Sequence, residues 1–335
     1  MSDPARERAA RERDDYFEIT ELAVDAGGSD PYEYRMGARD AVLAARWAAA
    51  ADPSDTRIGS ALRLAGELTV AVLTSIRSDG ETSLEIGGSI RPVVPGLPAE
   101  ALSGEQWANG LWAATAAGDA ASAVRLAVLR EAPPGESHED ESLLAAALAT
   151  WWRNGSDLGS RLIDALVATD PDGRADGDRL LEIAVPLIRV FRHLFADDDE
   201  ALMAAISDAA ARHRAFHRAS SGVDRPEQYL SLPLTGLVVL ARELSRAVPP
   251  DIDVVPDGVL RSSRSQIACA VCGQPLKSAE VVCHWCDADT TVDAPLETSI
   301  GELAAGSPTR CPTCSTENRA TALRCYSCSA SLLPD

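Results

Sequence analysis

The sequence is poor in lysine, in aromatic residues and in basic charge. Its 335 residues include one lysine, four phenylalanines and five tyrosines, with 31 basic side chains against 51 acidic ones. The formal net charge of -20 argues against binding to nucleic acid or to an anionic membrane, because affinity for phosphate needs clustered lysine and arginine. No apolar run reaches the length of about 18 residues that a membrane-spanning helix needs, so no membrane segment is expected.

The N-terminus also lacks the apolar run of a secretory signal peptide. Residues 1–13 are instead rich in charge, which predicts a charged N-terminal arm ahead of the first domain and a cytoplasmic protein. The sequence contains no G-x-S-x-G, no phosphate-binding G-x-x-x-x-G-K-[ST], and no G-x-G-x-x-G that opens a helix after a strand. We therefore predict that the protein is not an enzyme.

Alanine, by contrast, is abundant, with 57 copies, and it favours helices. Apolar residues recur at three- and four-residue steps through most of residues 14–248, and helix caps such as Asp30-Pro31, Ser103 with Gln106, and Asp119 punctuate them. This pattern predicts an all-α array of about ten antiparallel helices over residues 14–261. A helix is predicted at about residues 228–248, and it is apolar on almost every face from Leu230 to Leu240, which places it at the centre of the core.

Three segments depart from the helical pattern. Residues 82–98 hold two short apolar runs around Gly87-Gly88, which predicts a β-hairpin or an ordered loop. Pro186 lies inside an apolar helical run and is expected to kink or divide it. Residues 251–265 read as an extended exit from the helical body.

The eight cysteines form two modules of identical spacing, C-x2-C-x10-C-x2-C. The first comprises Cys269, Cys272, Cys283 and Cys286, and the second comprises Cys311, Cys314, Cys325 and Cys328. A two-residue gap lets two thiolates face one metal, and two such pairs complete a tetrahedral zinc site that leaves no position for water. Disulfides are not expected in a reducing cytoplasm, and a thioredoxin-like motif would need a βαβ context that is absent. We therefore predict two structural Zn²⁺ sites.

These modules predict a zinc ribbon at residues 262–290, a linker at 291–310 and a second ribbon at 311–335. Each module is too small to fold by burial alone, so zinc, worth about 10–16 kcal/mol in small fingers, is expected to supply the folding free energy. Both segments resemble the small zinc ribbons of bacterial proteins. The second also resembles the Ran-binding-protein class of finger, but it lacks that class's tryptophan before the first cysteine, near Arg310, and Arg319 stands where that class has an aromatic residue after Asn318. Base stacking is therefore not expected.

Other candidate sites have simpler interpretations. His213 and His217 have one metal-ligand spacing, but arginines flank them and no HExxH glutamate is present, so a solvated helix face is expected. Residues 170–178 suggest a calcium loop, but Arg174 and Ile183 occupy ligand positions, which favours a polar turn. The paired tryptophans are expected in the core: Trp107, Trp112, Trp151 and Trp152.

The helical region carries a resemblance to a known family. The resemblance rests on the hairpin-like stretch, Trp107 with Leu111 and Gly118-Asp119, the run from Tyr229 to Ala241, and Val255-Pro256 with Leu260. On these residues, 14–260 resemble the immunity protein 49 family of bacterial polymorphic toxin systems. The resemblance implies an all-α protein that binds and neutralises the active domain of a cognate toxin.

Charge suggests the nature of that partner. Residues 1–261 carry 26 basic and 43 acidic side chains, so a net charge of -17 belongs to the helical body. An acidic surface suits electrostatic capture of a basic toxin, such as a nuclease. The alternative is a zinc-ribbon adaptor or regulatory scaffold, in which the helical body docks one protein and the ribbons bind another protein or a nucleic acid.

Overall fold

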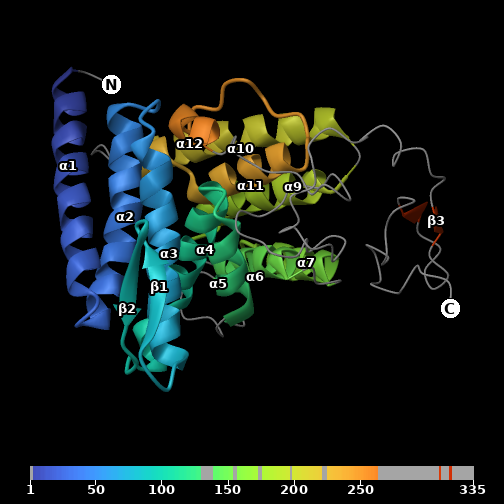
Figure 1. Cartoon of the computed structure of the whole chain (residues 1–335). Coiled ribbons are helices and arrows are strands. Elements are labelled where there is room, and N and C mark those ends of the chain that lie inside the picture. Colours follow the sequence, from blue (N-terminus) through green and yellow to red (C-terminus); the bar gives the residue numbers. More distant parts are fainter. Residues whose placement is uncertain are drawn as a thin grey trace, which may run out of the picture. The chain divides into compact units, whose positions relative to one another are not determined.

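The computed structural model describes residues 3–129, 139–153, 157–172, 176–196, 198–220, 225–262, 309–310 and 317–318. The chain divides into two compact units, a helical body at Met1–Arg264 and a C-terminal unit at Ser265–Asp335. The described part of the body is mostly helical, so the predicted all-α class is confirmed there (Figure 1). Its helices are α1 (Asp3–Ala26), α2 (Pro31–Ala51), α3 (Arg57–Arg77), α4 (Gly104–Ala116), α5 (Ala120–Leu129), α6 (Glu139–Trp152), α7 (Leu158–Val167), α8 (Gly177–Arg179), α9 (Val185–Leu194), α10 (Asp199–Ser220), α11 (Leu232–Glu243) and α12 (Asp257–Ser262).

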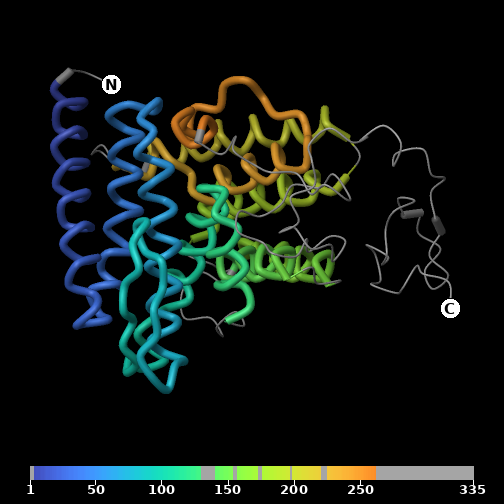
Figure 2. Tube along the Cα trace, viewed as in Figure 1, coloured from blue at the N-terminus to red at the C-terminus, as the bar shows by residue number. Residues whose placement is uncertain are grey.

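The first three helices lie side by side, as the tube in Figure 2 shows. The helix α1 runs through the boundary predicted at residue 13, so the structure has no separate arm at residues 3–13. The reason is packing: Ala9 is buried in a small cluster with Trp47 and Ala50 of α2, and the Arg8 guanidinium lies over the Trp47 ring. The charged residues of this segment thus cover an apolar contact.

The predicted caps are present. The Asp30 carboxylate accepts a hydrogen bond from the Tyr32 amide at 3.0 Å, with proline in the first turn of α2. Both hydrogen bonds of the capping box form between Ser103 and Gln106 at the start of α4. Asp119 accepts from the Ser122 amide at 3.2 Å and begins α5. These signals lie within four residues of the helix starts, so the sequence alone could show them.

Residues 82–98 do contain a β-hairpin. Strands β1 (Thr82–Ile86) and β2 (Ser89–Val93) pair antiparallel, with Ile86 opposite Ser89. The two residues between them, Gly87 and Gly88, have φ of 60° and 76°, as a type I′ turn requires. The Gly87 amide donates to the carboxylate of Glu67 at 2.8 Å, which fixes the tip of the hairpin against α3.

The expected break at Pro186 takes the form of a π turn. Between α8 and α9, residues Leu180–Ala184 form one π-helical stretch, and the Val185 amide donates to the Leu180 oxygen five residues back. Proline has no amide hydrogen and fits only the first turn of a helix, so the chain restarts as α9 with Pro186 in that turn.

Two predicted boundaries were wrong. The helix expected at 228–248 is shorter: a 3-10 turn occupies Pro226–Tyr229, and α11 spans Leu232–Glu243. Proline fits only the first turn of a helix, so Pro233 requires α11 to begin close to it. The exit expected at 251–265 instead contains α12, which docks on the body where the Gly258 amide donates to the Pro53 oxygen at 2.9 Å.

The helix α11 is buried in the core, as predicted. Leu234, Leu237 and Leu240 are fully buried, and α11 contacts α4, α9 and α10. Among the described residues, only α3 is long and apolar enough to cross a bilayer, and 72% of its apolar window is buried inside the body. The helix α3 therefore packs as a core helix.

Candidate functional site

The eight cysteines predicted to bind zinc lie outside the described residues. In the C-terminal unit the structure describes two short strands, β3 (Thr309–Arg310) and β4 (Glu317–Asn318), which pair antiparallel with Arg310 opposite Glu317. These strands bracket residues 311–316, the segment that holds Cys311 and Cys314. In the described part of the chain, no three His, Cys, Asp or Glu side chains come together as a metal site would require.

The pair of histidines on α10 is packed rather than solvated. The Nε2 atom of His213 lies 2.8 Å from the backbone oxygen of Glu227, and the His213 and His217 rings lie 4.4 Å apart. His213 is only 8% exposed, so its assignment to a solvated helix face was wrong. Burial lowers the pKa of His213 to about 4, against the opposing effect of the Glu227 oxygen, and burial also lowers the pKa of His217.

Burial of His213 predicts a pH-dependent stability. The unfolded chain takes up a proton near the ordinary pKa of 6.5, whereas the folded chain does so only near 4. The contribution of His213 to the free energy of unfolding is therefore fully present above about pH 6.5. It is lost as the pH falls towards 4, and the loss amounts to about 3 kcal/mol. We expect His213→Gln, whose amide can still donate to the Glu227 oxygen, to flatten that fall in urea titrations from pH 4.5 to 8. Parallel curves for wild type and variant would contradict this account.

Trp107, Trp112 and Trp152 lie in the core, as expected, whereas Trp151 is only partly buried and packs against it. The Trp107 indole nitrogen donates to the Leu126 oxygen at 3.1 Å, and that of Trp152 donates to the Thr115 hydroxyl at 3.0 Å. The acidic loop also behaves as a polar turn where it is described, because the Asp170 carboxylate accepts from the Asp172 amide at 3.0 Å. These side chains are therefore committed to holding the fold.

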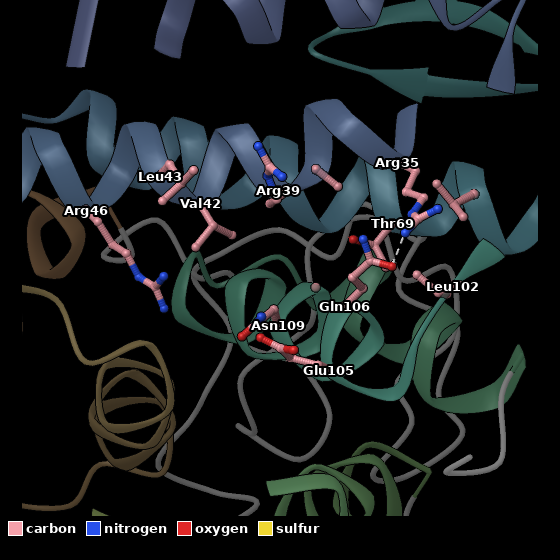
Figure 3. Close-up of a pocket in the computed structure, with 13 residues that line it drawn as sticks. Arg35, Arg39, Val42, Leu43, Arg46, Thr69, Leu102, Glu105, Gln106 and Asn109 are labelled. Atoms are coloured by element: carbon pink, nitrogen blue, oxygen red, sulfur yellow. Dashed lines mark hydrogen bonds between the residues drawn. The ribbon is translucent and has the colours of Figure 1, made fainter. Parts of the chain in front are cut away.

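A cleft of about 350 Å³ opens between α2 and α4, with part of α3 at its base. We call it the α2–α4 cleft (Figure 3). Its basic wall is formed by Arg35, Arg39 and Arg46 of α2, and its opposite wall by Glu105, Gln106 and Asn109 of α4. The remaining lining is mostly apolar and comprises Ala38, Val42, Leu43, Thr69, Val72, Leu102 and Gly110.

The three arginines are only partly neutralised by the body. The Arg35 Nε donates to Gln106 at 3.3 Å, the Arg39 Nε donates to Asp40 at 3.2 Å, and an Arg46 terminal nitrogen donates to Glu227 at 3.3 Å. The Arg46 Nε is buried and has no hydrogen-bond partner among the described residues. Burial removes water from the Arg46 guanidinium and so lowers its pKa, against the opposing effect of the Glu227 and Glu105 charges. The cleft can therefore bind an anionic group.

Sequence reasoning missed this cleft. The signal was present in part, because residues 35, 39 and 46 are separated by one and two turns and so share a face of a helix. What the sequence could not show is that Glu105 and Asn109, far along the chain, form the facing wall. The cleft exists only because α2 and α4 pack close together in the folded chain.

Comparison with known proteins identifies one family. A family model described as Immunity protein 49 matches residues 49–259, which is more than half of the chain and lies inside the helical body. No curated protein and no solved structure matches the chain.

Proposed function

Because this chain belongs to the immunity protein 49 family, we propose that it binds a cognate polymorphic toxin domain and neutralises it in the cytoplasm of the cell that makes both. The observation that carries this proposal is the match of the family model to residues 49–259, which spans most of the helical body. Neutralisation here means covering the toxin, without chemistry performed by this chain. The absence of a recognisable catalytic motif from the sequence is compatible with that role.

The direct test is survival of cells that make both proteins. The toxin domain encoded beside this gene should kill cells when produced alone and should be tolerated when this chain is produced with it. The two proteins should also co-purify. Full toxicity in the presence of the folded chain would overturn the proposal.

We further propose that the toxin is basic, such as a nuclease, and that charge accelerates its capture. The supporting observation is the net charge of -17 on residues 1–261. Opposite charges raise association rates at low ionic strength. Near physiological salt concentrations, the attraction is largely screened between charges more than about 8–10 Å apart. We expect the association rate to fall about tenfold or more between 50 and 500 mM NaCl, with a smaller change in the dissociation rate. An association rate independent of salt would contradict electrostatic capture.

We propose that the C-terminal unit holds two structural zinc ions, bound by the cysteine modules at 269–286 and 311–328. The support is the exact repeat of the ligand spacing, together with the pairing of β3 and β4 on either side of residues 311–316. In this proposal the ribbons serve as structural or protein-interaction modules. Deletion of residues 262–335 tests their role, because a truncated chain that still protects cells would make the ribbons accessory to neutralisation.

The second candidate function is an adaptor or regulatory scaffold. The division of the chain into two units favours it, because the body and the ribbons could each hold a different partner. A neighbouring gene for a secreted toxin with a variable C-terminal domain would favour immunity, whereas an operon of regulatory genes would favour the adaptor. Co-purification from the native cell, followed by identification of the bound protein, would separate the two.

A further inference from the structure

The α2–α4 cleft has the opposite charge character to the body around it. Residues 1–261 carry a net charge of -17, yet the cleft is lined by three arginines and by one acidic residue, Glu105. Within the described residues, Arg35 and Arg39 use only their Nε atoms in hydrogen bonds, so both terminal nitrogens of each remain available. The Arg39 side chain is 59% exposed and lies where a partner can reach it. A guanidinium presents paired donors that suit a carboxylate.

The length of the cleft favours an extended peptide over a small free carboxylate as its occupant. Arg35 and Arg46 are eleven residues apart on one helix, which corresponds to about 16 Å along its axis at about 1.5 Å per residue. An extended peptide covers that distance with about five residues, at about 3.3 Å each. A small free carboxylate could reach one arginine but could not follow the row.

The lining of the cleft also contains apolar residues, which suit apolar side chains of an occupant. Ala38 and Leu43 are partly exposed and present apolar surface in the cleft, whereas Val42, Val72 and Leu102, which also line it, are buried. Successive side chains of an extended segment point to opposite sides, so a segment can direct carboxylates to the arginines and apolar side chains to that apolar surface. The Asn109 amide lies on the facing wall, where it can pair with the main chain of such a segment, and Gln106 offers its NH2 group, since its oxygen already accepts from Arg35 and Ser103.

We propose that the α2–α4 cleft receives an acidic, partly apolar segment of the toxin, whose carboxylates bind Arg35 and Arg39. This inference rests on the proposed function and adds the surface and the chemistry of the contact. The acidic body attracts a basic partner over a distance, whereas the cleft accepts one segment of opposite charge and so fixes the orientation of the complex. Arg35, Arg39 and Arg46 all precede the stretch matched by the family model, which begins at residue 49. The facing wall, with Glu105, Gln106 and Asn109, lies inside that stretch.

The test compares two double variants of the full chain with equal changes in charge. Arg35→Gln/Arg39→Gln removes the two accessible guanidinium groups of the cleft. Arg63→Gln/Arg125→Gln removes two exposed arginines that line no part of it. Binding is measured by calorimetry against a catalytically inactivated toxin domain encoded beside this gene. We expect the cleft variant to raise the dissociation constant about tenfold or more and the control to change it less than about threefold.

Folding and small anions are checked separately. Both double variants should keep the wild-type thermal midpoint, and the single variant Arg39→Gln, at the most exposed position, should still weaken binding about threefold if the double variant misfolds. Equal affinities of the cleft and control variants would overturn the cleft proposal while leaving the immunity function in place. Citrate bound by wild type and lost in the cleft variant, with toxin binding unchanged, would assign the cleft to a free anion instead. Failure of the wild type to bind the toxin would overturn the immunity function itself.

Discussion

Removal of zinc with a chelator is expected to unfold the C-terminal unit, residues 265–335, and to leave the helical body folded. The proposed ribbons are each too short to hold a fold by burial, so the metal, at about 10–16 kcal/mol per small finger, would supply most of their stability. The body is a separate compact unit with its own core, so its unfolding should not depend on the metal. The readout on the full chain is zinc content, expected at about two ions per chain from the two ligand sets, together with trypsin cleavage after Lys277, Arg319 and Arg324 before and after chelation.

A matched control separates the metal from the cysteines. Cys272→Ser and Cys314→Ser each remove one ligand of one module, so each should lower the zinc content by about one ion per chain. The urea midpoint of the body should be the same in wild type, in both variants and after chelation. A chain purified without zinc, or a body that loses stability on chelation, would contradict two independent metal-folded modules.

Truncation of Trp107 to alanine is expected to cost about 3–5 kcal/mol of unfolding free energy, the range typical of a buried aromatic side chain. Trp107 is fully buried, and its indole nitrogen donates to the Leu126 oxygen of α5, so the side chain joins α4 to α5. The substitution leaves a cavity and removes the hydrogen bond from the indole to the Leu126 oxygen. Urea unfolding followed by circular dichroism gives the midpoint and the slope.

Ile90→Ala is the matched control for this prediction. Ile90 is 71% exposed on β2, and its truncation should change the unfolding free energy by less than about 0.5 kcal/mol. Trp107→Phe should fall between the two, at about 1–3 kcal/mol, because the ring is retained in part and the hydrogen bond is lost. If Trp107→Ala costs no more than Ile90→Ala, α4 and α5 do not pack as described.

Helix starts were the part of the fold that could be predicted most fully. Asp30, Ser103 and Asp119 cap helices by hydrogen bonds to amides two or three residues ahead. The hairpin turn is equally local, because Gly87 and Gly88 can adopt the positive φ that other residues avoid. Such interactions involve neighbours in the chain, so the order of residues is sufficient to predict them.

The candidate sites divide in the same way. The spacing of the eight cysteines is a sequence property, and it supports the zinc proposal wherever the C-terminal unit lies. The burial of His213 is different, because it depends on Glu227 in a 3-10 turn that approaches from another part of the body. A histidine with arginine neighbours in the sequence gave no sign that its ring would be enclosed.

The sequence by itself determined the helical class of the body, its acidity, the cysteine modules and the positions of most helix starts. Only the tertiary structure decided which helices approach closely. An added Cβ on Gly110 of α4 would meet the buried Thr69 side chain of α3, and the Gly258 amide docks α12 on Pro53. The same packing set the arginines of α2 opposite Glu105 and Asn109 and so formed the α2–α4 cleft. Contacts between residues distant in the chain depend on how side-chain volumes fit together, and local sequence patterns do not encode that fit.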